Sequence, residues 1–197
     1  MERVVGAMLL TMSLPVVVVA AIALVALSRR SPLVAHQRVG HGGRPIWVLK
    51  LRTMWTGSSD NGRFSFVEYV RASDADCRAP KRAMDPRVTN RFAAYCRRLS
   101  IDELPQLWHV VQGDMALVGP RPLTRYELNT YYGPATVQVL RKRPGLSGLW
   151  QISGRSRLSY AQRRRLDLFM IRKWSLRLYW KILIATVPRV LTGKDAW

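Results

Sequence analysis

The chain has 197 residues, enough for one domain with a real core, and its 32 Lys+Arg against 12 Asp+Glu give a formal net charge of +20. It contains no zinc-finger, RNP-like or zipper-type basic pattern, and Cys77 and Cys96 stand without CxxC or CxxH spacing. These features argue against nucleic-acid binding, a structural metal site and a disulfide framework, and they favour an anionic partner such as lipid headgroups or phosphorylated ligands.

The N-terminal residues predict a membrane helix. Residues 4–27 form a 24-residue run without a charge. As a helix this run would extend about 36 Å, more than the roughly 30 Å of a bilayer core. The run is too long for a signal-peptide core, and it is followed at once by Arg29 and Arg30. Because positive flanks stay inside, everything after Arg29 is expected in the cytoplasm.

Pro15 lies near the middle of this run and is expected to bend or break the helix. The hydroxyl of Ser13 is placed to satisfy backbone groups that the proline frees. Two outcomes are open: a kinked helix that spans the bilayer, or a helix that dips into one leaflet and returns. Hydropathy alone favours the spanning helix.

The rest of the chain predicts an α+β fold that is mainly helical. Glycines 40, 42 and 43 indicate the turn of a small β-hairpin within 35–54, and 55–87 reads as a surface excursion with one short helix. Helices are expected over 88–99, with Phe92, Tyr95 and Leu99 on one face, over 102–110 and around 123–133. Residues 143–155 indicate a loop or short strand. A helical region from 160 to 191, broken near Trp174, has an amphipathic second half that suits either a membrane interface or a core.

The stretch Ser100 to Pro122 holds the adjacent carboxylates Asp102 and Glu103. One interpretation is structural: Ser100 and Glu103 match a capping box, and Pro105 shifts the expected cap towards Asp102. The other is catalytic, since an ionised carboxylate at a helix start can attack phosphorus, and Mg²⁺ would relieve repulsion between the two acids. Arg121, between two prolines, would then stabilise a transferring phosphoryl group.

From Gln37 to Trp197 the chain resembles the monotopic phosphoglycosyl transferases, a family of bacterial sugar transferases. The resemblance rests on motifs that occur in the family's order and cover most of the chain: QRVGHGGRP, KLRTM, DPRVT, RRLSIDELPQLWHVVQGDMALVGPRP, RPGLSGLWQISGR and RLDLFMIRKWSL. It implies a ping-pong reaction in which a UDP-sugar gives its sugar phosphate to an aspartate and releases UMP. Undecaprenyl phosphate then accepts the sugar phosphate, as the first membrane step of exopolysaccharide, O-antigen, capsule or glycoprotein glycan assembly.

The resemblance also implies roles for individual residues. Asp102 would be the nucleophile and Glu103 the Mg²⁺ ligand. Residues matched to substrate or phosphate binding, or to the integrity of the site, are Arg52, Arg97, Arg121, Arg143, Gln151, Arg155 and Asp167. Residues 1–30 would form a re-entrant membrane helix broken near Ser13 and Pro15, although in this chain Leu14 separates the two. Residues 31–197 would form a compact catalytic domain with amphipathic interface helices, monotopic on the cytoplasmic face of the bacterial inner membrane.

Two other classes of function remain open at this point. A non-catalytic basic module attached to the membrane would bind anionic lipid or nucleic acid, but would leave Asp102, Glu103 and Arg121 without a role. A direct glycosyltransferase would release UDP in place of UMP. The sequence leaves open the sugar, the glycan pathway, the uridine contacts, the depth of the N-terminal helix and whether the protein forms a homodimer.

Overall fold

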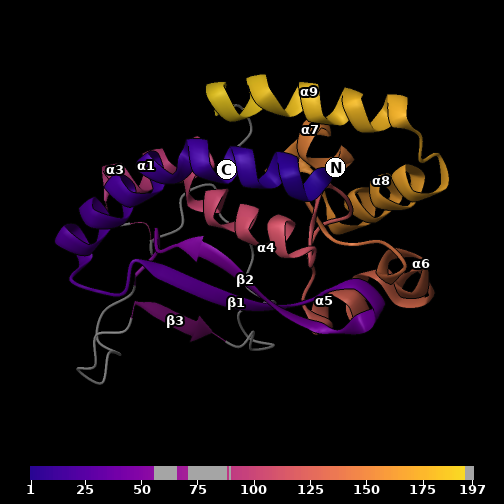
Figure 1. Ribbon diagram of the computed structural model, residues 1–197. Coiled ribbons are helices and arrows are strands. Elements are labelled where there is room, and N and C mark those ends of the chain that lie inside the picture. The colour runs from indigo at the N-terminus through magenta and orange to yellow at the C-terminus, as the bar shows by residue number, and fades with distance from the viewer. Residues whose placement is uncertain (56–65, 71–87, 89, 194–197) are drawn as a thin grey trace.

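The computed structural model of the protein describes residues 1–55, 66–70, 88 and 90–193 (Figure 1). Its first helix, α1 (Glu2–Ser28), lies along α4 (Leu107–Gln112), and a three-stranded sheet lies on the other side of α4. The last helix, α9 (Leu176–Thr192), lies on the α1 side of the molecule. The described residues thus have the predicted α+β class, with helices predominating.

The expected break near Ser13 and Pro15 is not seen: helix α1 continues through Pro15 and ends at Ser28, where Arg29 with its left-handed backbone (φ 53°) caps it. The hydroxyl of Ser13 donates to the carbonyl of Leu10 at 3.1 Å. A proline at position 15 removes the usual donor to the carbonyl of Thr11. The Ser13 hydroxyl therefore bonds one carbonyl earlier than the one that proline leaves without its helical partner, and the helix stays helical at this point.

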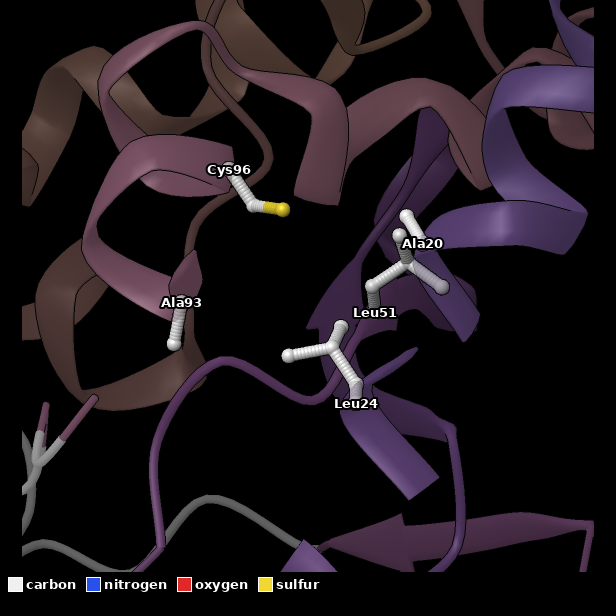
Figure 2. Packing of buried hydrophobic residues seen from close by; sticks show 5 residues of the cluster. All are labelled: Ala20, Leu24, Leu51, Ala93 and Cys96. Carbon is white, nitrogen blue, oxygen red and sulfur yellow. The ribbon is translucent and has the colours of Figure 1, made fainter. Parts of the chain in front are cut away.

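Both halves of α1 pack on the rest of the protein. Near its start, a Cβ at Gly6 would lie 2.9 Å from Cγ1 of Val110, so α1 and α4 touch closely at this glycine. Near its end, Ala20 and Leu24 are buried against Leu51, together with Ala93 and Cys96 (Figure 2). The expected boundary at residue 30 follows the end of the helix, but α1 shares a core with what comes after it.

The opposite side of α1 is apolar and exposed. The helix is long and apolar enough to cross a membrane, and few of its residues are buried. The large exposed side chains are Val4, Met8, Leu9, Met12, Leu14, Val16, Val18, Val19, Ile22 and Leu27. Such a surface is unusual for a protein that lies wholly in water, because exposed apolar patches of this extent mark contact with a membrane or partner.

The predicted hairpin is confirmed as strands β1 (Leu33–Val39) and β2 (Pro45–Leu51), which pair antiparallel from Leu33↔Leu51 to Val39↔Pro45. Between them, η1 (His41–Gly43) contains two glycines with positive φ. A third strand, β3 (Val67–Val70), pairs parallel to β1, so that the sheet order is β2-β1-β3. This strand was not predicted, and most of the expected surface excursion with its short helix lies outside the described residues.

The predicted helix at 88–99 is confirmed as α3 (Arg91–Arg98), and of its predicted face Phe92 packs against the core, whereas Tyr95 does not. Asn90 caps it by accepting the N–H of Phe92 at 2.7 Å. The buried residues are Ala93 and Cys96, whereas Tyr95 is 54% exposed. Ala93 and Cys96 belong to one buried cluster with Ala20 and Leu24 of α1 and Leu51 of β2 (Figure 2).

The second predicted helix in this region begins as a tighter 3-10 turn, η2 (Ile101–Gln106), and continues as α4. Pro105 lies within η2 and brings no N–H to the helix. After α4, the short strand β4 (Ala116–Val118) leads to Gly119 and Pro120 and then to Arg121. The predicted helix near 123–133 is confirmed as α5 (Arg125–Glu127) and η3 (Leu128–Tyr132), followed by η4 (Gly133–Ala135) and α6 (Thr136–Leu140).

Strand β5 (Gly145–Ser147) pairs parallel to β4, which confirms the expected short strand. The backbones approach so closely at Gly119 and Gly145 that a Cβ on either glycine would collide with the other strand. The remaining elements are α7 (Leu149–Ser153), which was not predicted, η5 (Arg155–Arg157) and α8 (Tyr160–Arg172). The predicted break near Trp174 is confirmed, since α9 begins at Leu176 with Ser175 as its cap.

Helix α9 has one face on the protein and one face outward. Ile182 is fully buried with Val118 and Met170, whereas large apolar side chains are exposed along the other side, namely Leu176, Trp180, Ile184, Val187 and Leu191. The hydroxyl of Tyr179 donates to the carboxylate of Glu2 at 2.9 Å, which joins the start of α1 to α9. The two helices with exposed apolar surfaces are thus linked on one side of the molecule (Figure 1).

Candidate active site

The two adjacent carboxylates lie in the first turn of η2, and neither caps it. Ser100 precedes the turn with a left-handed backbone (φ 57°), and its side chain makes no capping bond. Glu103 instead receives a hydrogen bond from Lys50, with 2.6 Å between Nζ and Oε1. The capping-box interpretation is therefore wrong. The carboxylate of Glu103 points to the neighbouring strand β2.

Lys50 and the surrounding arginines keep Glu103 ionised. Burial acts to raise the pKa of Glu103, but the ion pair with Lys50 and the charges of Arg121 and Arg155 outweigh it and bring the pKa down to about 2. The Glu103 side chain retains 29% exposure. It is thus a charged, reachable carboxylate at neutral pH.

Asp102 has the opposite electrostatic environment. Its side chain is buried, and burial is the main cause that raises its pKa to about 6 from an ordinary 3.8. The charge of Glu103 acts in the same direction, whereas Lys50 and Arg97 favour the ionised form. Neighbouring carboxyl groups with pKa values pushed apart are a recurrent arrangement in active sites. At pH 7 Asp102 is mostly ionised but poorly solvated, as suits a nucleophile.

His109 fixes the edge of the strand that carries Lys50. Strand β2 lies at the edge of its sheet, and the Leu49 N–H donates to Nε2 of the buried His109 at 3.2 Å. Burial lowers the pKa of His109, so that the ring is neutral and can accept this bond. The histidine, to which the sequence assigns no role, therefore supports the backbone next to Lys50.

A cluster of arginine and aromatic side chains lies on the other side of the pair. The guanidinium of Arg121 lies 4.9 Å from the ring centre of Trp150, and that of Arg163 lies 5.2 Å from the same ring. Arg163 is buried and also faces the ring of Tyr160 at 5.4 Å. Burial and the nearby charge of Arg121 lower the pKa of Arg163. The rings thereby hold two cations close together, which favours an anion between or beside them.

Asp167 lies at the base of this cluster and is fully buried. Its Oδ2 accepts a hydrogen bond from the hydroxyl of Tyr132 at 2.8 Å. Burial raises the pKa of Asp167 to about 7, while the Tyr132 hydroxyl and the charges of Arg121 and Arg163 act against this rise. The charge of Arg121 thus acts on Asp167 directly, which connects this buried carboxyl group to the arginine cluster.

The other residues implied by the resemblance are distributed around and beyond this centre. Arg97, on α3, contributes its charge to Asp102. Gln151, on α7, donates to the carbonyl of Leu146 at 2.7 Å. Arg143 lies exposed before β5. Arg52 is buried, donates from Nε to the carbonyl of Ser31 at 2.8 Å and forms an ion pair with Glu68 on β3.

The structure adds three residues that sequence reasoning missed: Lys50, Trp150 and Arg163. Lys50 and Arg52 are two positions apart, and strand alternation places such residues on one face without choosing between them. The sequence assigns no role to Trp150 or to Arg163. Only the approach of 120–121, 150 and 163 in space indicates their role.

The carboxylate pair fits Mg²⁺, although the described residues contain no cluster of three or more His, Cys, Asp or Glu side chains. Mg²⁺ commonly takes one or two carboxylates and completes its shell with water and substrate phosphates. Glu103 is an ionised, partly exposed oxygen donor of this kind. When the metal binds, Lys50 would have to share or release the carboxylate of Glu103.

A small cavity is lined in part by Pro120 and Arg121, so it reaches the arginine cluster of the site. A larger one of about 290 Å³ is lined by residues of β1, the start of β2 and α5, among them Gln37, Pro45 and Arg125. Neither carboxylate of the pair lines it. The chemistry of the carboxylates and arginines, and not the size of a cavity, therefore marks the candidate site.

Known proteins resemble this chain over the region that holds the candidate site. The sequence profile of the family described as "Bacterial sugar transferase" matches residues 1–193. The "UDP-galactose-lipid carrier transferase" of Erwinia amylovora is 39% identical over 199 residues, which cover 98% of this chain and 40% of that protein. The "Exopolysaccharide production protein ExoY" of Rhizobium meliloti is 42% identical over 166 residues, which cover 82% of this chain and 71% of that protein.

A third relative is the "UDP-glucose:undecaprenyl-phosphate glucose-1-phosphate transferase" of Caulobacter vibrioides, which is 36% identical over 205 residues covering all of this chain and 70% of that protein. The chain thus spans less than half of the Erwinia protein and about seven tenths of the other two. Since the family profile matches nearly every residue and the relatives share more than a third of their aligned positions, this chain belongs to the bacterial sugar transferase family.

Proposed function

We propose that this chain transfers a sugar phosphate from a UDP-sugar to undecaprenyl phosphate, with Asp102 as the covalent nucleophile. The observation that carries the proposal is the carboxylate pair in η2, where buried Asp102 has a raised pKa and partly exposed Glu103 a lowered one, under the influence of Lys50, Arg97, Arg121 and Arg155. The names of relatives supply the substrates: two are named for UDP-sugars and one for undecaprenyl phosphate.

In the first step an ionised oxygen of Asp102 attacks the β-phosphorus of the UDP-sugar. A bond forms between this oxygen and phosphorus, and the bond between the β-phosphorus and the bridging oxygen breaks, so that UMP leaves with the electron pair. Burial of Asp102 removes water that would otherwise solvate the carboxylate. Lys50, Arg97 and Arg121 offset the negative charge that gathers around the phosphorus.

In the second step a phosphate oxygen of undecaprenyl phosphate attacks the same phosphorus. The acyl-phosphate bond to Asp102 breaks, the carboxylate is regenerated, and the product is an undecaprenyl-diphospho-sugar. Arg155 and Arg121 would bind the acceptor phosphate in this proposal, and their charges already act on Glu103 next to the nucleophile. Mg²⁺, when bound at Glu103, would screen the charge of the donor diphosphate.

The proposal places the protein on the cytoplasmic face of the bacterial inner membrane, with α1 re-entrant. Supporting this topology, Glu2 at one end of α1 bonds Tyr179, and Leu24 near the other end packs against Leu51 and Cys96. A helix that contacts the same folded body through both halves does not separate that body by a bilayer. The exposed apolar sides of α1 and α9 would lie in the leaflet, at the depth of the acceptor phosphate.

The activity is tested by incubating the purified protein with UDP-sugars, Mg²⁺ and undecaprenyl phosphate. We expect UMP release, and an added phospho-sugar on Asp102 in the mass spectrum of the quenched enzyme. Asp102→Asn should abolish both while membrane association persists. Release of UDP without an adduct would support a direct glycosyltransferase, and no release with a broad panel of UDP-sugars would support a non-catalytic module.

The topology is tested by placing single cysteines at positions 2 and 30 and labelling them from each side of the membrane. Cys77 is first replaced by serine, whereas Cys96 can remain because burial raises the pKa of its thiol to about 11 and keeps it unreactive. We expect both positions to react only from the cytoplasmic side. Reaction of position 2 from the outside would restore the spanning helix.

A further inference from the structure

Two residues with left-handed backbones are hydrogen-bonded to each other next to the carboxylate pair. Ser100 has φ 57° and Arg155 has φ 44°, and of the described residues other than glycine only Arg29 shares such a value. The Nη2 of Arg155 donates to Oγ of Ser100 at 2.6 Å. Left-handed backbone is unfavourable for residues with a Cβ, and it persists where the surroundings hold it in place.

Ser100 is the point at which α3 passes into the turn that carries Asp102. Its backbone N–H donates to the carbonyl of Arg97 at 3.1 Å, and its carbonyl accepts the N–H of Glu103 at 3.1 Å. The direction of Asp102, two residues later, therefore follows from the conformation of Ser100. The hydroxyl takes no part in capping, so its bond to Arg155 is the side-chain contact that fixes this conformation.

The backbone of Arg155 is in turn bound by Arg163. Nη2 of Arg163 donates to the backbone carbonyl of Arg155 at 3.1 Å. Arg163 is buried between the rings of Trp150 and Tyr160, and it has little room to move. A continuous path of contacts thus leads from the aromatic rings through Arg163 and Arg155 to Ser100, joining segments that are 55 residues apart.

We propose that Ser100 is a positioning residue, which Arg155 and Arg163 lock so that Asp102 is aimed at the donor phosphorus. The proposal rests on the transferase activity proposed above. Arg155 has a double task, since its charge acts on Glu103 while its Nη2 holds Ser100. Binding of a substrate phosphate by Arg155 is then coupled mechanically to the orientation of the nucleophile.

The test is a double-mutant cycle on Ser100→Ala and Arg155→Met, read as the rate of the pre-steady-state UMP burst. Displacement of a reacting group by about 1 Å can cost on the order of a hundredfold in rate. We expect each single variant to slow the burst by about ten- to a hundredfold, with little change in KM for the UDP-sugar in Ser100→Ala. Because both remove one contact, the double variant should be no slower than the slower single variant.

Two further variants separate positioning from general stability. Ser100→Gly tolerates the left-handed backbone but lacks the hydroxyl, so we expect the burst to be slow while the melting temperature is nearly retained. Ser147→Ala is the matched control, because Ser147 is a buried serine whose hydroxyl lies 2.6 Å from that of Thr186. It should lower the melting temperature without slowing the burst.

Hydrogen exchange tests the contact between Arg155 and Ser100 without catalytic turnover, and therefore separately from the proposed transferase activity. Hydrogen exchange of the Glu103 amide, which bonds the carbonyl of Ser100, should be faster in Ser100→Ala and in Arg163→Met than in the natural protein. Unchanged exchange, or burst effects that multiply in the double variant, would overturn the positioning role while leaving the transferase intact. A natural protein that gives no UMP burst would instead overturn the proposed function, and the exchange measurement would still decide the contact.

Discussion

In metal-free protein we expect the carboxyl group of Asp102 to titrate near pH 6, well above an ordinary aspartate. Burial is the main cause, and the charge of Glu103 adds to it. With a pKa of about 6, roughly a tenth of the molecules carry an ionised Asp102 at pH 5 and roughly nine tenths at pH 7. Since only the ionised form attacks phosphorus, the fraction of metal-free protein that is ready to react should fall about tenfold from pH 7 to pH 5.

The titration can be followed directly by NMR of protein labelled with ¹³C at the aspartate carboxyls. The chain contains only eight aspartates, and the Asp102 signal is the one that disappears in Asp102→Asn. Lys50→Met removes the cation that most favours the ionised form, so its inflection should move to higher pH. Lys142→Met is the matched control, since the ammonium of Lys142 lies 5.3 Å from the ring of Trp174.

An Asp102 inflection near pH 4, or one that Lys50→Met does not move, would refute the electrostatic reasoning. Addition of Mg²⁺ supplies a second check. A divalent cation at Glu103 favours the charged form of its neighbour, so the Asp102 inflection should move to lower pH as the metal is added. No movement at saturating Mg²⁺ would remove Glu103 as the metal ligand.

Three further predictions concern packing. Asp167→Ala leaves the buried Tyr132 hydroxyl without its acceptor and should lower the free energy of unfolding by about 1–3 kcal/mol, measured by thermal unfolding. Asp167→Asn keeps an acceptor oxygen and should lower it less. If both variants are as stable as the natural protein, this reasoning is contradicted. Gly145→Ala should prevent correct folding because its Cβ would collide with Gly119, while Gly42→Ala, with open space and φ 66°, should cost only about 1 kcal/mol of backbone strain in the same assay. Gly6→Leu should separate α1 from α4 and speed hydrogen exchange in α4, and unchanged exchange would argue against that contact.

The sequence was most informative where one local pattern dominated. The hairpin turn at 40–43, the helix at 91–98 and the break before α9 were predicted because glycine, periodic apolar residues and a polar interruption each act within a few positions. Strand β3 was missed because its pairing with β1 is parallel and long-range, so its partner lies more than thirty residues away. The face of α3 was only partly predicted because the small side chains of Ala93 and Cys96, which are buried, give a weaker apolar signal than Tyr95, which is exposed.

The residues of the candidate site were likewise only partly predictable from the sequence. Asp102 and Glu103 stood out in the sequence because adjacent acids are rare in so basic a chain. The capping interpretation is excluded only by tertiary contacts, since Lys50 donates a hydrogen bond to Glu103 and Arg155 donates one to Ser100. Trp150 and Arg163 could not be predicted, because they are distant in the sequence from Asp102 and their contact with each other is tertiary: the guanidinium of Arg163 lies 5.2 Å from the centre of the Trp150 ring. Local residue types thus indicate the reactive groups, whereas the groups that orient them depend on tertiary contacts.

The shared packing of Ala20 and Leu24 with Leu51, Ala93 and Cys96 has a practical consequence (Figure 2). A soluble enzyme cannot be made by deleting the first 30 residues, because the deletion would strip one wall from the core beneath α3. The loosened α3 would carry Arg97 away from Asp102. Helix α1 is thus a structural part of the folded body that carries Asp102, and a functional truncation of this chain would have to keep it.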